Sequence, residues 1–332
     1  MSFPWPAGAA TSIGSLPGTD PAEAVRLVFG ELGELPFLPE LPARGPGADL
    51  IGRSAALLVA LPVEIVPSGW RFAAHPGRDQ RRALDFLERD LDTLQERHGD
   101  YVGPVKLQVA GPWTLAAAIE LPAGHKAVSD PGAARDIAAS LADGMAQHLA
   151  AVGARLPGAQ LILQLDEPSL PAVLSGQVPT ASGYGSVAAV DVPVAQPALA
   201  QVLDQDAAAA TVAHCCHPDA PFGVFTGAGA SALALDLTTT PSSAQLDALA
   251  TAADAGTALW LGVVPGTDAA LDRAELVQRV RRFWDVLGLD PARLAAQAVP
   301  TTACGLAGAS AGYVRRAFTT LREIGQELRE LQ

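Results

Sequence analysis

Short runs of nonpolar residues alternate along the chain with longer stretches in which nonpolar positions recur every three or four residues. The short runs are rich in leucine and β-branched residues and contain few polar residues, which is typical of parallel strands covered on both faces. The longer stretches have the periodicity of helices. This alternation predicts an α/β fold built around a parallel sheet.

Eight of the short runs are candidate strands, and most are followed by a helical stretch. The candidate strands are residues 10–17, 35–42, 105–112, 159–168, 210–216, 231–237, 258–265 and 298–306. The clearest helical stretches are residues 133–156, 194–205, 243–256, 273–288 and 311–331. Eight such units predict a (β/α)8 TIM barrel. Residues 63–72 contain proline and glycine and are interpreted as an inserted hairpin. We find no linker or repeat, so residues 1–332 are expected to form one domain.

Composition narrows the possible functions. The chain is 49% hydrophobic and 17% charged, as expected of a globular protein with a core. Its net charge of −13 argues against a nucleic-acid partner, which requires clustered Lys and Arg. No nonpolar stretch reaches the ~18 residues of a membrane span. Three cysteines, two of them adjacent, make a poor disulfide framework and favour a reducing, cytoplasmic location.

Polar residues recur where the predicted strands end. These residues are Ser15, Glu40, Asp166, Glu167, His214, Cys216, Asp236 and Cys304. In a barrel of this type the chemistry takes place at the carboxyl ends of the strands. The shared position therefore predicts one functional site.

The stretch "AHCC" places His214 and Cys216 two residues apart in a strand, so that both side chains point to the same face. A histidine nitrogen and a thiolate sulfur together favour zinc. The chain has one further cysteine outside this stretch, Cys304, and Asp236 could add an oxygen. These four residues are the candidate Zn²⁺ ligands.

Each of these residues also has a structural interpretation. The cysteines could be small buried packing residues, and Asp236 could cap a helix that begins near Thr239. Cys215 and His217 point away from the His214 face and are interpreted as neighbours rather than ligands.

Two adjacent carboxylates, Asp166 and Glu167, end the fourth predicted strand, and Glu40 ends the second. Buried carboxylates are costly unless they are paired or solvated. They could bind a cationic substrate group, but they could also cap a helix near Pro168 or lie exposed in a loop.

The first and third predicted strands contribute two weaker candidates. Ile13, Gly14 and Ser15 could offer backbone N–H groups to a carboxylate. Trp113, just beyond the third strand, could form the wall of a substrate pocket or simply pack beneath a loop.

Six segments, in order along nearly the whole chain, together resemble the C-terminal catalytic barrel of cobalamin-independent methionine synthases. They are "TSIGSLP", "LPELPARGPGADLIG", "VKLQVAGPWTL", "LQLDEPSL", "AHCC" and "ACGL". The related uroporphyrinogen decarboxylases share the fold but not this set of cysteines.

The resemblance implies a zinc-dependent methyltransferase that makes methionine from homocysteine. The zinc would bind the homocysteine thiol, whose free pKa is near ~8.5, and hold it as a thiolate. Asp166, as the candidate catalytic residue, and Glu40 would pair with the substrate ammonium. The backbone from Ile13 to Ser15 would meet its carboxylate.

Three features depart from the family pattern. Asp236 stands where the family has a glutamate ligand, the seventh strand lacks the family's histidine, and we expect no N-terminal folate-binding barrel. The methyl donor is therefore either methylfolate or a methylcorrinoid protein. Two alternatives remain: transfer of an alkyl group to a different thiol, and a decarboxylase-like barrel, for which Arg44, Arg53 and Arg71 could face anionic groups.

Overall fold

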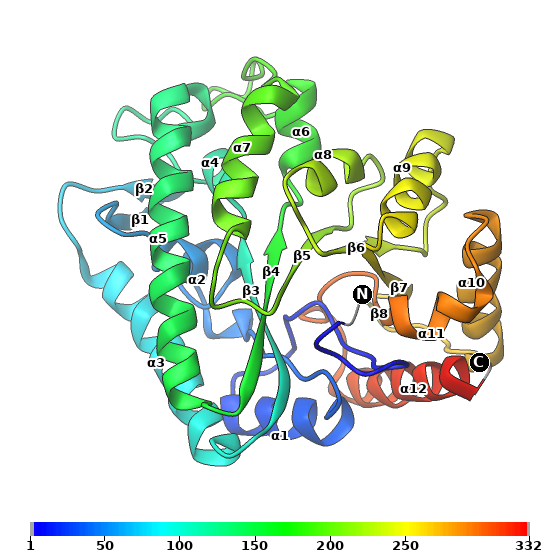
Figure 1. Ribbon diagram of the computed structural model, residues 1–332. Helices are drawn as coiled ribbons and strands as arrows, with labels where there is room; N and C mark the ends of the chain where they lie inside the picture. The colour runs from blue at the N-terminus through cyan, green and yellow to red at the C-terminus, as the bar shows by residue number, and fades with distance from the viewer. Residues whose placement is uncertain (1–2, 331–332) are drawn as a thin grey trace.

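A parallel β-sheet forms the centre of the molecule, and helices cover its outer face (Figure 1). The structure is a computed structural model that describes residues 3–330. Six strands pair in the order β3-β4-β5-β6-β7-β8, all parallel, and the sheet they form is curved. The predicted α/β class and parallel sheet are thus confirmed.

The elements have the following bounds. The sheet strands are β3 (Gly103–Ala110), β4 (Ala159–Asp166), β5 (Ala210–Cys215), β6 (Ala232–Asp236), β7 (Ala258–Val264) and β8 (Ala298–Thr302). The helices are α1 (Pro21–Glu31), α2 (Leu50–Ala55), α3 (Arg78–His98), α4 (Pro112–Ala118), α5 (Pro131–Arg155), α6 (Leu170–Ser175), α7 (Val192–Leu203), α8 (Phe222–Gly227), α9 (Ser243–Asp254), α10 (Arg273–Val286), α11 (Leu294–Gln297) and α12 (Ala311–Glu330). Short 3-10 turns occur at η1 (Pro42–Arg44), η2 (Ala127–Ser129) and η3 (Pro291–Arg293).

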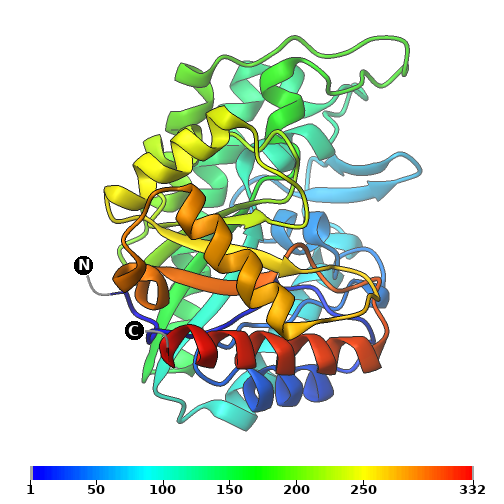
Figure 2. The ribbon, with the colours of Figure 1, turned by 90° about the vertical axis from the view of Figure 1, so that its right-hand side faces the viewer.

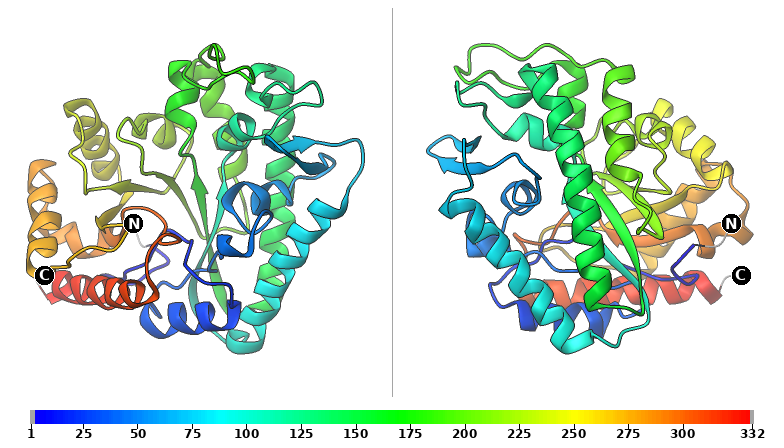
Figure 3. Two further views of the ribbon diagram at one scale, coloured as in Figure 1. Left: turned by 180° about the vertical axis from the view of Figure 1, so that it is seen from behind. Right: turned by 60° about the vertical axis from the view of Figure 1, so that its left-hand side comes forward.

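The nonpolar character of the strands explains the layers. Every residue of β5 and of β7 is buried, because side chains packed inside the curved sheet cover one face and the helices cover the other. Helices α3 and α5 lie along one side of the sheet, and α12 lies beside α1 (Figures 2 and 3). Local signals fix the helix ends: the Asp20 side chain caps α1, and Ser242 with Gln245 forms a capping box on α9.

The first two predicted strands, 10–17 and 35–42, do not form regular strands. They pair through single parallel bridges, Ser15 with Glu40 and Phe37 with Lys106. Further backbone hydrogen bonds join Thr11 to Pro300 of β8 and Leu38 to Lys106 of β3. Prolines interrupt the second segment, and proline cannot donate to a ladder. Both segments therefore lie between β8 and β3 without extending the six-stranded sheet.

The predicted insertion at residues 63–72 is confirmed as an antiparallel hairpin of β1 (Val63–Val66) and β2 (Gly69–Phe72). It projects from the side of the molecule away from β6 to β8 (Figure 1). Among the helices within residues 3–330, none is both long enough and nonpolar enough to cross a membrane.

Candidate active site

A cavity of about 200 Å³ opens at the carboxyl ends of the strands. It is lined by Ile13, Ser15, Glu40, Pro42, Leu50, Asp166, Pro168, His214, Cys216, Cys304 and Gly305. Seven of the residues that the sequence nominated are among them: Ile13, Ser15, Glu40, Asp166, His214, Cys216 and Cys304. The structure thus brings segments that are almost 300 residues apart in sequence to one hollow.

His214 is held by Asp166 on the neighbouring strand. The β4–β5 register places the two residues opposite each other, and Nδ1 of His214 lies 2.6 Å from Oδ1 of Asp166. Burial is the largest single effect on the pKa of His214 and would lower it, but the hydrogen bond to Asp166 and the charges of Asp166 and Cys304 together outweigh burial, and the pKa is raised. The other ring nitrogen, Nε2, is buried and has no hydrogen-bond partner among the described residues. The carboxylate therefore orients the ring and leaves Nε2 available as a ligand atom.

Cys216 and Cys304 meet across the cavity, with their sulfur atoms 3.2 Å apart. The hydrogen bond between the two thiols lowers the pKa of Cys304 to about 6 and raises that of Cys216. The pair therefore holds a thiolate near neutral pH, which is the form that binds metals.

Glu40 is buried in the cavity wall. Burial raises its pKa to about 7. The largest effect that lowers this pKa is the positive charge of Arg53, whose Nε lies 3.8 Å from the carboxylate. Lys106 is also fully buried, and burial lowers its pKa to about 7 while Asp166 and Glu40 raise it. The cavity therefore has carboxylates facing it and cations behind them.

Arg53 belongs to a buried charge cluster that reaches outward to α3. Asp90 on α3 accepts two hydrogen bonds from Arg44, at 2.7 and 2.8 Å, and one from Arg53 at 2.7 Å. All three side chains are less than a tenth exposed. Arg44 is thus committed to Asp90 and does not line the cavity, while Arg71 pairs with Glu64 on the inserted hairpin.

Glu167 is fully buried and is not among the residues that line the cavity. Its carboxylate accepts hydrogen bonds from the backbone amides of Trp113 and Thr114, at 2.9 and 2.8 Å, and from the Thr114 hydroxyl at 2.6 Å. A Cβ at Gly111 would overlap this carboxylate, so a larger residue there would displace the Glu167 side chain. Glu167 therefore caps the start of α4, the helix after β3, rather than a helix near Pro168.

Besides Glu167, the nominated residues Asp236, Trp113 and Gly14 lie outside the cavity lining. Asp236 accepts from the backbone amide and the hydroxyl of Thr238, both at 2.6 Å, and it does not cap α9. Trp113 is buried and donates its indole N–H to the carbonyl of Ala195. Gly14 packs so closely on the Gln108 side chain that a Cβ would come within 2.7 Å of it. The roles of Asp236 and Trp113 in the site stay predictions.

Cys215 and His217, the sequence neighbours of His214 and Cys216, are structural residues. Cys215 is buried in the main hydrophobic core, and His217 accepts a hydrogen bond from the Asp219 amide at the surface.

Several polar residues beneath the cavity were not predicted. Lys106 and Gln108 on β3 and Gln164 on β4 are buried inside the sheet. The signal was visible in the sequence, since each is a polar residue in an otherwise nonpolar strand and Lys106 and Gln108 are two positions apart.

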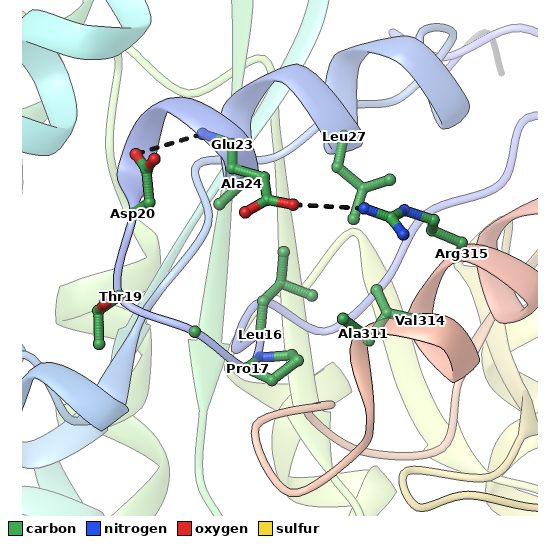
Figure 4. Close-up of a pocket in the computed structure, with 11 residues that line it drawn as sticks. Leu16, Pro17, Thr19, Asp20, Glu23, Ala24, Leu27, Ala311, Val314 and Arg315 are labelled. Atoms are coloured by element: carbon green, nitrogen blue, oxygen red, sulfur yellow. Dashed lines mark hydrogen bonds and ion pairs between the residues drawn. The ribbon is translucent and has the colours of Figure 1, made fainter.

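A second cavity, of about 290 Å³, lies between α1 and α12 (Figure 4). Its floor is formed by nonpolar side chains such as Leu16 and Val314. Its charged groups are already paired: Glu23 with Arg315 at 3.3 Å, and Asp20 with the first amides of α1. This cavity shows no unpartnered reactive group.

The donor set of the first cavity fits Zn²⁺. It combines an unpartnered imidazole nitrogen with two cysteine sulfurs 3.2 Å apart, which is nitrogen–sulfur chemistry of the kind zinc prefers. Within residues 3–330 no three His, Cys, Asp or Glu side chains form a complete ligand cluster. His214, Cys216 and Cys304 line the cavity together, and their side chains would have to move closer to one another to hold such an ion.

Comparisons with known proteins identify the family of the chain and a solved structure of similar fold. The family described as the cobalamin-independent synthase catalytic domain matches residues 8–327. A structure of a B12-independent methionine synthase from Shewanella sp. W3-18-1, in complex with selenomethionine, is 14% identical, covers 98% of each chain and has a TM-score of 0.66. A family 1 β-glucosidase from Thermotoga maritima is 9% identical, covers 76% of this chain and 79% of its own, and has a TM-score of 0.31. No curated protein matches the chain.

Proposed function

Because the chain belongs to the family of cobalamin-independent synthase catalytic domains, we propose that it transfers a methyl group to the thiol of homocysteine and so forms methionine. The observation that carries the proposal is that Glu40, Asp166, His214, Cys216 and Cys304 line one cavity. We further propose that residues 1–332 form a single catalytic (β/α)8 barrel, in which segments 10–17 and 35–42 take the places of the first two strands.

The proposed cofactor is Zn²⁺, held by His214, Cys216 and Cys304. When bound, it would supply Lewis-acid chemistry that lowers the pKa of a substrate thiol. Asp236 stays a predicted fourth ligand, and it would have to give up its hydrogen bonds to Thr238 to reach the ion.

The remaining groups suit the amino-acid part of homocysteine. Glu40 lines the cavity and would pair with the substrate ammonium when ionised. One oxygen of Asp166 is occupied by both His214 and Gln164, so Oδ2 is the atom left for the ammonium. The methyl donor is a methylfolate or a methylcorrinoid protein.

Metal content and turnover together test the proposal. The wild-type protein should contain about one zinc per chain, and Cys216→Ser and Cys304→Ser should each lose most of it. Cys215→Ser is the matched control and should keep its zinc, because Cys215 points into the core.

Methionine formation should then be assayed with methyltetrahydrofolate, its polyglutamate form and methylcobalamin side by side. We expect one of these donors to support turnover in the zinc-loaded protein. Equal zinc in all four proteins would refute the metal site, and a zinc-loaded protein that binds no homocysteine would refute the substrate.

A further inference from the structure

The sheet contains a buried polar network directly below the candidate active site. Lys106 and Gln108 on β3 lie next to β4, and Gln108 is paired in register with Gln164. Lys106 is 0% exposed, although lysine is normally a surface residue. It is one of only two lysines in the chain. A buried ammonium is costly unless it is hydrogen-bonded or paired, so a specific set of partners is expected.

Those partners are the two segments that lack regular strand structure. Nζ of Lys106 donates to the carbonyl of Ile13 at 2.6 Å and to the Gln108 side chain at 3.2 Å. Gln164 donates to the same Ile13 carbonyl at 2.9 Å. Gln108 donates to the carbonyl of Leu38 at 2.6 Å. These side chains therefore add to the backbone hydrogen bonds that hold segments 10–17 and 35–42 between β8 and β3.

The Ile13 carbonyl is next to the part of the chain that enters the cavity. Ile13 and Ser15 both line it, and the Ser15 carbonyl is fixed by the amide of Leu306 at 2.8 Å. Within residues 3–330, the amides of Gly14 and Ser15 donate to no protein acceptor. Two adjacent free N–H groups beside a cavity are suited to an anion such as a carboxylate.

We propose that Lys106 is a positioning residue that holds the Ile13–Ser15 backbone so that its free amides bind the carboxylate of an amino-acid substrate. The identity of the substrate as homocysteine rests on the proposed function. Lys106 itself acts from behind the backbone, through Ile13, and does not touch the substrate.

The test uses Lys106→Met, which has a similar length but no donor and no charge. Lys126→Met is the matched control, because Lys126 is the other lysine and pairs with Glu120 away from the cavity lining. Zinc-loaded proteins are titrated calorimetrically with three thiols: homocysteine, 4-sulfanylbutanoate, which lacks the amine, and 3-aminopropane-1-thiol, which lacks the carboxylate.

We expect Lys106→Met to lower the affinity for homocysteine and for 4-sulfanylbutanoate by about tenfold or more. The displaced amides of Gly14 and Ser15 would then lose their hydrogen bonds to the charged carboxylate of the ligand. The affinity for 3-aminopropane-1-thiol should change by less than about threefold, since removing a cation behind Glu40 and Asp166 does not disfavour an amine. Lys126→Met should change none of the three. An equal loss of affinity for all three thiols in Lys106→Met would overturn the proposal.

A second measurement keeps the two proposals separate. Amide hydrogen exchange over residues 10–17 should become faster in Lys106→Met and not in Lys126→Met, because the Ile13 carbonyl loses its strongest contact. If the wild-type protein binds none of the thiols, homocysteine is wrong as the substrate, and this exchange result alone decides the role of Lys106. Unchanged exchange over residues 10–17 would overturn that role.

Discussion

Glu40 makes substrate binding sensitive to pH near neutrality. Burial raises the pKa of this carboxyl to about 7, and only the ionised form can pair with an ammonium group. Lowering the pH from 8 to 6 should therefore lower the affinity for homocysteine by about tenfold through this group alone. Dissociation constants measured calorimetrically at pH 6, 7 and 8 check the expectation.

The control for this experiment is Glu40→Gln. It should bind homocysteine weakly at every pH and should keep only the slope that comes from the thiol and the other ionisable groups. If the variant shows the same slope as the wild type, Glu40 is not the group responsible.

At the scale of single residues, position along the chain predicted which residues line the candidate cavity better than it predicted the partner of each side chain. Glu40, Asp166, His214 and the two cysteines stand at strand ends, and parallel strands bring such ends together. Trp113 and Asp236 occupy equivalent positions, yet their side chains are bound to Ala195 and Thr238. Those partners come from turns and from a helix packed nearby, which strand periodicity does not encode.

At the scale of elements, burial on both faces made the regular strands recognisable. The nonpolar runs of β3 to β8 were predicted because covered strands tolerate few polar residues. Segments 10–17 and 35–42 looked similar, but Pro36 and Pro39 in the second remove ladder donors and Lys106 holds the first through a side chain. A contact from a residue 93 positions away is not visible in local periodicity.

Helix α4 gives an element-scale prediction. Its first turn is held by three hydrogen bonds to Glu167. In Glu167→Gln, the new amide N–H group would face backbone donors, and a buried donor would be left unsatisfied. We expect the free energy of unfolding at pH 8 to fall by about 1–3 kcal/mol, as measured by urea denaturation.

Glu96→Gln provides the comparison, since Glu96 is an exposed residue of α3. Its free energy of unfolding should stay within about 0.5 kcal/mol of the wild type. A Glu167→Gln protein as stable as Glu96→Gln would mean that the cap contributes little to the stability of α4.

At the scale of the whole molecule, the charged cluster of Asp90, Arg44 and Arg53 joins the outer helix α3 to the cavity wall at Glu40. One carboxylate partners two buried guanidinium groups, and no side chain of the cluster is more than a tenth exposed. The cluster was not predicted, because Asp90 lies on a helix whose other charged residues are mostly exposed. It connects η1, α2 and α3, none of which belongs to the sheet.

Removing Asp90 should therefore destabilise the molecule as a whole. Asp90→Asn leaves Arg44 without a carboxylate partner and Arg53 with only the more distant Glu40, and we expect the free energy of unfolding to fall by about 3–5 kcal/mol. Adding Arg44→Met removes one of the stranded cations, so the double variant should be more stable than the sum of the two single losses implies. Urea denaturation of all four proteins in the cycle measures this coupling, which should be about 1 kcal/mol or more.

The exposed pair of Glu23 and Arg315 is the contrast, because there the same cycle should give a coupling below about 1 kcal/mol. Strictly additive losses at Asp90 and Arg44 would show that the cluster is held by its surroundings rather than by its own charges.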